Sequence, residues 1–169
     1  DRYKEICKTT SKGITLKKWR PKGDHILVIP PSYHTARWYG IDRADWENDI
    51  VKQLKRFTER EIRVRHKYIG NTDWGNKVRK PLSEDLKNCW AMVSWHSMCA
   101  VEAVMNGIPS FTSPHSPASP VSLPLYNLDS IEDPHMPDRE QWLYSLLGAQ
   151  FTKSEMQSGY AYSFLQDEK

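Results

Sequence analysis

The chain has 169 residues, of which 38% are hydrophobic and 27% charged, a composition typical of one globular domain and not of a disordered segment. Its formal net charge of +3 suits a phosphate-bearing ligand but is too small by itself to indicate a nucleic-acid-binding protein. No run reaches the roughly 18 apolar residues of a membrane span and no signal peptide is visible, so we expect a cytoplasmic protein.

After a basic segment (residues 1–24), the chain predicts a buried strand, a helix and a second strand. "HILVIPPS" (25–32) is rich in Ile and Val and is stopped by two prolines, as at the end of a buried strand. "EIRVRHK" (61–67) alternates apolar and charged residues, which indicates a strand with one wetter face, and 68–80 is a loop by its Gly, Asn and Asp content. Between the strands, Asp42 is a candidate N-cap for a helix whose apolar residues are Trp46, Ile50, Val51, Leu54 and Phe57.

The same alternation of elements continues in the middle of the chain. "PLSEDLKNC" (81–89) begins with proline and predicts a short helix, and "WAMVSW" (90–95) predicts a buried strand. A helix is expected over 98–106, with Gly107 suited to its C-terminal cap, and "IPSFTS" (108–113) predicts another strand.

The last third of the chain is rich in proline before it becomes helical. Residues 114–137 lack periodicity and predict a long irregular connection. The stretch "TSPHSPASP" (112–120), which overlaps the start of this connection, is typical of a stiff loop that closes over a site. Ser116 and Ser119 are its candidate polar contacts. Two helices are expected at the end, one over 138–150 and one that begins with a capping box formed by Thr152 and Glu155.

This order of elements predicts an α/β fold: a Rossmann-like open parallel sheet over residues 25–169, with helices on both faces and two helices at the C-terminus. In such sheets ligands bind at the carboxyl ends of the strands. A site is therefore expected in the segments 30–38, 65–70, 95–97 and 113–119.

The three cysteines (Cys7, Cys89 and Cys99) are irregularly spaced and include no Cys-x-x-Cys pair. Cys89 and Cys99 lie in apolar surroundings. We therefore expect buried free thiols in a reducing compartment, and neither a disulfide framework nor a metal site.

"WHSMCAVEAVMNGIPSF" (95–111) places His96 and Ser97 where a strand gives way to a helix. The free N–H groups of a helix start attract anions, and Ser97 either donates to a phosphate oxygen or only caps the helix. Glu102 lies on that helix among small apolar residues. Its carboxylate suits the vicinal hydroxyls of a ribose or sugar, and the alternative is a solvated helix residue.

Two further segments supply candidate ligand contacts. Arg65, His66 and Lys67 follow one another at a strand end, where cations can hold a diphosphate or, alternatively, protect an edge strand from aggregation. "PPSYHTARWYG" (30–40) contributes Ser32 and Arg37, with neighbouring aromatic residues that can stack on a ring. No Gly-x-Gly-x-x-Gly fingerprint, Gly-x-Ser-x-Gly elbow or P-loop lysine is present, which argues against a dinucleotide enzyme, a serine hydrolase and a P-loop enzyme.

The succession of "RVRHK", "LSEDLKNC", "WAMVSWHSM" and "AVEAVMNGIPSF" resembles the C-terminal, nucleotide-binding half of GT-B glycosyltransferases. The pattern is most similar to capsule-polysaccharide and CDP-glycerol-type transferases, and to shorter glycosyltransferase-like proteins of bacteriophages and bacteria. It covers about residues 25–120. It departs from the family at His66-Lys67, where His-Pro is common, and at His96-Ser97, where the family has two serines.

The resemblance implies a nucleotide sugar as the donor substrate, with no cofactor and no metal. It implies that His66 and Ser97 contact the donor phosphates and that Glu102 holds ribose or sugar hydroxyls. The acceptor would be a surface polysaccharide or a modified DNA base. A nucleic acid is not expected as a partner in any other role. Because the family's acceptor-binding N-terminal domain is not in these residues, the chain would be the C-terminal part of a longer protein in a bacterium or an infected host cell. No catalytic residue is assigned.

The alternative is a non-catalytic protein of the same fold that acts by protein–protein interaction. Seven tryptophans and eight tyrosines leave aromatic side chains for a partner surface, and Trp19, Trp38 and Trp74 lie in expected loops. Catalysis predicts that Glu102→Ala abolishes turnover without unfolding the protein, whereas a scaffold role predicts that this change is silent.

Overall fold

The computed structural model describes residues 14–66 and 81–167, which divide into two compact units. The larger unit spans Thr15–Asp138, and the smaller one includes residues 139–167. Residues 15–24, expected to be part of a separate basic segment, belong with the larger unit. Within it, the Lys17 N–H donates to the Met105 carbonyl at 2.9 Å and the Arg20 N–H to the Gly107 carbonyl at 2.8 Å.

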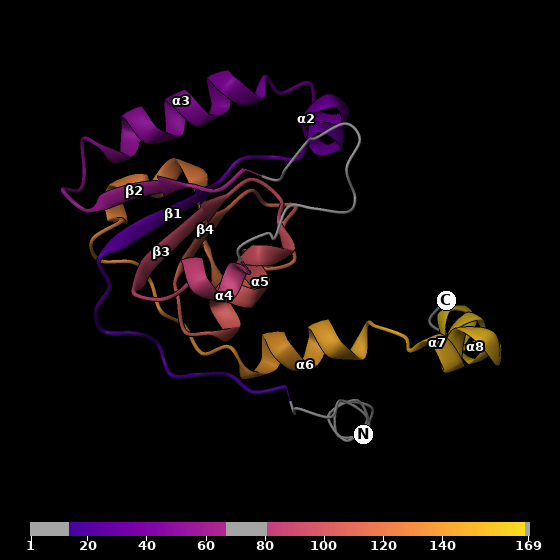
Figure 1. Cartoon of the computed structure of the whole chain (residues 1–169). Coiled ribbons are helices and arrows are strands. Elements are labelled where there is room, and N and C mark those ends of the chain that lie inside the picture. The colour runs from indigo at the N-terminus through magenta and orange to yellow at the C-terminus, as the bar shows by residue number, and fades with distance from the viewer. Residues whose placement is uncertain (1–13, 67–80, 168–169) are drawn as a thin grey trace. The chain divides into compact units, whose positions relative to one another are not determined.

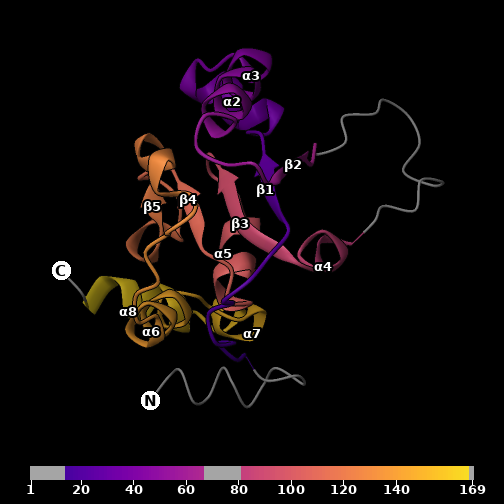
Figure 2. The same cartoon turned by 90° about the vertical axis from the view of Figure 1, so that its left-hand side faces the viewer.

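Five parallel strands form one sheet in the described part of the chain, in the order β2-β1-β3-β4-β5 (Figures 1 and 2). The predicted α/β class with an open parallel sheet is therefore confirmed. The first four strands lie where the sequence predicts them, whereas β5 falls in the segment expected to be irregular. The strands are β1 (His25–Ile29), β2 (Glu61–Val64), β3 (Cys89–Ser94), β4 (Ser110–Thr112) and β5 (Leu123–Pro124).

The strand sequences match their places in the sheet. The central strands β1 and β3 are buried at every residue, as expected for strands covered on both faces, and their sequences are almost continuously apolar. Strand β2 lies at an edge and alternates exposed with half-buried residues, so Glu61 and Arg63 face solvent while Ile62 and Val64 pack inward.

Helices cover both faces of the sheet, with α3 on one side and α5 on the other (Figures 1 and 2). Asp42 caps α3 as predicted, because its carboxylate accepts the N–H groups of Ala44 and Asp45. Helix α2 was not predicted, and it occupies most of the segment expected to be a ligand-binding loop. The helices of the larger unit are α2 (Tyr33–Tyr39), α3 (Arg43–Leu54), α4 (Leu82–Asp85) and α5 (Met98–Met105).

One face of the sheet carries a hydrophobic core cluster. Ile50 and Leu54 of α3 pack against the β1 side chains of Ile26 and Val28. The same cluster receives Leu128 and Ile131 from the end of the proline-rich segment, which forms the 3₁₀ helices η1 (Ser119–Val121) and η2 (Leu125–Ser130). The segment expected to be irregular therefore contributes to the core.

Helix α5 packs on β3 and β4 through small side chains, and Gly107 follows its C-cap, Asn106. This glycine has φ 76°, a left-handed conformation, and a Cβ at its position would lie 2.0 Å from the Lys18 carbonyl oxygen. Both facts restrict the position to glycine. The predicted cap is one residue too late, because the C-cap is Asn106 and Gly107 is the left-handed residue that follows it.

The smaller unit contains the expected C-terminal helices. The first is α6 (Glu140–Gly148). The second begins with the predicted capping box, in which Thr152 and Glu155 accept each other's backbone N–H groups, and it is divided at Gly159 into α7 (Lys153–Gln157) and α8 (Tyr160–Asp167). Among the described residues, no helix has the length and apolarity that crossing a membrane requires.

Candidate functional site

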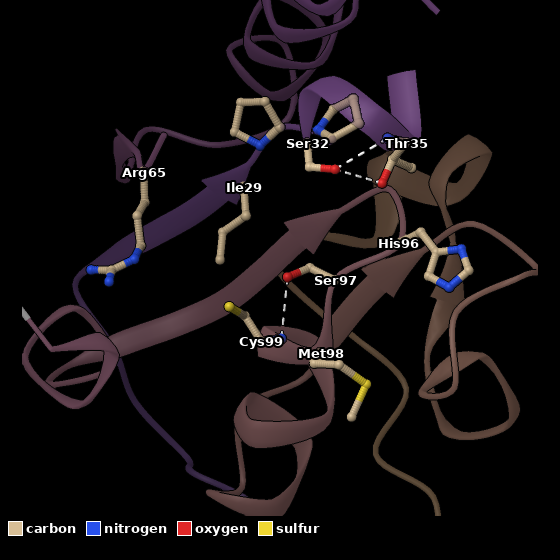
Figure 3. A pocket seen from close by; sticks show the side chains of 10 residues that line it. Ile29, Ser32, Thr35, Arg65, His96, Ser97, Met98 and Cys99 are labelled. Carbon is tan, nitrogen blue, oxygen red and sulfur yellow. Dashed lines mark hydrogen bonds between the residues drawn. The ribbon is translucent and has the colours of Figure 1, made fainter. Parts of the chain in front are cut away.

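The strand order creates a crevice at the carboxyl ends of β1 and β3. Strand β2 pairs with one side of β1 and strand β3 with the other side. The loops that follow β1 and β3 therefore lead in different directions and leave a crevice between them. A pocket of about 380 Å³ lies at this point, which we call the switch-point pocket (Figure 3). Its lining residues are Ile29, Pro30, Pro31, Ser32, Thr35, Arg65, His96, Ser97, Met98 and Cys99.

The loop after β1 brings two hydroxyl groups to the pocket. Ser32 is the N-cap of α2, and its Oγ accepts the Thr35 N–H at 3.1 Å. The Ser32 and Thr35 hydroxyls also share a hydrogen bond of 2.8 Å (Figure 3). This small network fixes both hydroxyls, and each oxygen keeps capacity for a further hydrogen bond to a ligand.

The loop after β3 brings the start of α5 to the opposite wall. Ser97 caps this helix, since its Oγ accepts the Cys99 N–H at 3.2 Å, so the capping role considered from the sequence is confirmed. Met98 and Cys99, the first residues of the helix, also line the pocket. The helix start, where backbone N–H groups carry partial positive charge, therefore faces the cavity.

Arg65 extends from the end of β2 to the third side of the pocket. Its guanidinium forms an ion pair with the Asp85 carboxylate of α4, and the two side chains are only 18% and 16% exposed. Figure 3 shows Arg65 across the pocket from His96, with Ser32 and Ser97 between them. The pocket thus combines one fixed cation with hydroxyl groups and a helix start, a set of groups that suits a phosphate.

The ion pair is supported by a buried histidine on the neighbouring strand. His25 Nε2 lies 2.9 Å from the backbone carbonyl oxygen of Asp85, so the ring donates to that oxygen. Burial lowers the pKa of His25 below its ordinary value, which keeps the ring neutral at pH 7. His25 therefore helps to hold α4, and with it the carboxylate that positions Arg65.

Of the other predicted contacts that the structure describes, His96 lines the switch-point pocket, whereas Arg37, His66 and Glu102 do not. His66 Nε2 lies 2.6 Å from a carboxylate oxygen of Glu47 on α3, so Arg65 and His66 extend in different directions, as strand alternation predicts. Arg37 on α2 and Glu102 on α5 are exposed and do not line the pocket. Their roles toward a ligand stay predictions, and Lys67 lies outside the described residues.

A cluster of rings beside the pocket was not predicted. Tyr39 at the end of α2 stacks on His115, with ring centroids 5.5 Å apart and planes 25° from parallel. Its ring also lies 6.1 Å from Trp95 and 6.4 Å from His96, so it joins the loops after β3 and β4. From the sequence, Trp38 or Tyr39 was a candidate to stack on a ligand ring; the rings that Tyr39 contacts in the structure belong to the chain itself.

The cysteines differ in their surroundings. Cys89 is buried, and burial raises the pKa of its thiol to about 12, so it remains protonated. Cys99 is only partly buried because it lines the pocket, which corrects the expectation that both thiols are buried. Within residues 14–66 and 81–167, no three His, Cys, Asp or Glu side chains gather in a way that could hold a metal ion.

Thr35, Cys99 and Asp85 were missed as site residues by the sequence analysis. Thr35 follows the cap Ser32 by three residues, a spacing that places both in the first turn of a helix, but that helix was not predicted. Asp85 and Arg65 are 20 residues apart, and no local pattern joins them. Comparison of the sequence and structure with protein-family models, curated proteins and solved structures finds no match.

Proposed function

We propose that the switch-point pocket binds the diphosphate of a nucleotide sugar, and that the chain is the donor-binding part of a glycosyltransferase. The observation that carries this proposal is the gathering of Arg65, Ser32 and Ser97 from three strand ends around one pocket. The resemblance of the sequence to GT-B transferases supports the choice of a nucleotide sugar among phosphate-bearing ligands.

In this proposal the start of α5 and the Ser97 hydroxyl hold phosphate oxygens, and Arg65 binds them from the other side. An acceptor hydroxyl forms a bond to the anomeric carbon and loses its proton to water, while the bond from that carbon to the phosphate oxygen breaks. The nucleoside diphosphate leaves with the electron pair. Arg65 and the helix N–H groups stabilise the charge that develops on it. The acceptor, a polysaccharide or a modified base, remains part of the proposal.

The test is calorimetric titration of the protein with UDP, CMP, CDP, GDP and their sugar conjugates. We expect one nucleotide to bind and its affinity to fall about tenfold in Arg65→Lys, because lysine keeps the charge but loses the bidentate geometry of the guanidinium. Ser97→Ala should weaken binding in the same direction. The matched control is His66→Gln, which changes the adjacent residue outside the pocket and should bind as the wild type does.

Two results would contradict the proposal. One is the failure of every nucleotide to bind a protein that is demonstrably folded. The other is an equal effect of Arg65→Lys and His66→Gln, which would move the ligand away from the pocket. Glu102→Ala separates the sequence-based assignment from the pocket: a loss of binding in this variant would place the ligand on the exposed side of α5.

A second candidate function is protein binding by a non-catalytic domain. It is favoured by the exposure of large aromatic side chains on the larger unit, where Trp38 is 84% and Tyr126 86% exposed. If no nucleotide binds, Trp38→Ser and Tyr126→Ser should abolish association with a partner protein while leaving the fold intact. Association with the partner that survives both substitutions would contradict this candidate function.

A further inference from the structure

A row of residues crosses the carboxyl end of the sheet. Ile29, Ser94, Thr112 and Pro124 are partners in register on β1, β3, β4 and β5, so their side chains point to the same face. Ile29 lines the switch-point pocket at one end of the row. Thr112 and Pro124 line a second pocket, of about 260 Å³, which we call the β4–β5 pocket.

The β4–β5 pocket contains hydroxyl groups whose hydrogen bonds are incomplete. Thr112 is 1% exposed, and its Oγ1 has no hydrogen-bond partner in the described structure. The buried Oγ of Ser122, which also lines the pocket, has none either. Ser119, which also lines the pocket, differs because its Oγ donates to the Pro114 carbonyl oxygen at 3.1 Å. Buried polar groups normally have partners, so a ligand group that pairs with Thr112 and Ser122 is expected at this place.

The lining of the pocket restricts the chemistry of that ligand. None of the described residues that line it is charged, and besides its three hydroxyl residues it presents prolines and Leu123. A hydroxyl both donates and accepts, so Thr112 and Ser122 match a ligand whose own groups do the same. The apolar proline rings suit the C–H faces of a ring, and an anion would find no compensating charge.

We propose that the β4–β5 pocket binds a neutral, hydroxyl-bearing ring, namely a sugar. The Thr112 and Ser122 hydroxyls exchange hydrogen bonds with the sugar hydroxyls, and the prolines of the 114–124 segment pack on its apolar face. Ile29 and Thr112 are separated by two strand spacings, about 10 Å. Both pockets therefore lie at the carboxyl end of the sheet, close to each other. The inference does not depend on the proposed function, because a free sugar is a sufficient probe of the β4–β5 pocket.

The test is a titration of the full chain, labelled with ¹⁵N, with free monosaccharides: glucose, galactose, mannose and N-acetylglucosamine. We expect at least one to shift the backbone amide signals of Thr112 and Ser122 at millimolar concentration. Thr112→Val, which replaces the hydroxyl by a methyl group of similar size, should weaken binding about tenfold, and Ser122→Ala provides a second variant should the first not fold.

The matched control is Ser110→Ala. Ser110 is on the same strand and the same face as Thr112, is 2% exposed and also has an unpaired Oγ, but it does not line the pocket. This variant should bind the sugar as the wild type does. The inference is overturned if no sugar shifts the two amide signals, or if the pocket variants bind as tightly as the control.

The two proposals fail in distinguishable ways. If nucleotides bind through Arg65 but no monosaccharide affects Thr112 and Ser122, only the sugar pocket is refuted. If a monosaccharide binds at Thr112 while no nucleotide binds, the sugar pocket stands and the donor-binding function is refuted.

Discussion

The ion pair between Arg65 and Asp85 provides a quantitative test of how the switch-point pocket is built. We consider Asp85→Asn, which removes the carboxylate charge but keeps the size of the side chain. Solvent-exposed ion pairs contribute about 0–1 kcal/mol, whereas removing one partner of a fully buried pair costs about 3–5 kcal/mol. Because the two side chains are 18% and 16% exposed and so not fully buried, we expect a loss just below the buried range, about 2–3 kcal/mol.

The assay is urea unfolding of the wild type, Asp85→Asn, Arg65→Gln and the double variant, followed by circular dichroism. The double variant removes both charges, so it should be more stable than the sum of the single losses predicts, by about 1–2 kcal/mol. A coupling energy below about 0.5 kcal/mol would refute the reasoning, because independent sites already show deviations of that size. Arg65 would then be positioned by something other than Asp85.

Two further predictions concern His25, which holds α4, and Gly107, which follows α5. Because the folded state lowers the pKa of His25 from its ordinary value of 6.5, the unfolded chain binds more protons below that pH, so stability should fall as the pH decreases from about 7 to 5. His25→Gln should flatten this dependence in unfolding titrations, and an unchanged slope would contradict it. Gly107→Ala should lower the unfolding free energy by more than about 2 kcal/mol, since the added Cβ would lie 2.0 Å from the Lys18 carbonyl oxygen. Gly40→Ala is the control: Gly40 has φ 64° but nothing within 4 Å, so only the backbone cost of about 1 kcal/mol applies, and equal losses would refute the steric argument.

The elements that the sequence predicted correctly have strong local signals. The apolar runs of β1 and β3 are long enough to indicate buried strands, and the Asp42 carboxylate marks the start of α3. The elements that the sequence did not predict have weak local signals. Helix α2 has seven residues and no apolar periodicity, although Ser32 and Gly40 are caps at its two ends. Strand β5 has two residues and includes a proline, too few for any alternation.

The site was only partly predictable, for similar reasons. The rule that ligands bind at the carboxyl ends of strands led to Ser32, Arg65 and Ser97, which line one pocket. Glu102 was singled out because its neighbours are apolar, but it shares a face of α5 with Met98, four residues earlier, and both are exposed. The partner of Arg65 comes from α4 and is known only once the chain is folded.

The two outer strands of the sheet bear on whether copies of the chain associate edge to edge. At one border of the described sheet, β2 presents Glu61 and Arg63, which pair with each other at 2.6 Å and remain exposed. At the other border, β5 is two residues long and ends in Pro124, which has no N–H to offer another strand. Charges, short length and proline each discourage the addition of a strand from a neighbouring molecule. The parallel sheet is therefore protected against growth by strand addition at both borders, independently of what its pockets bind.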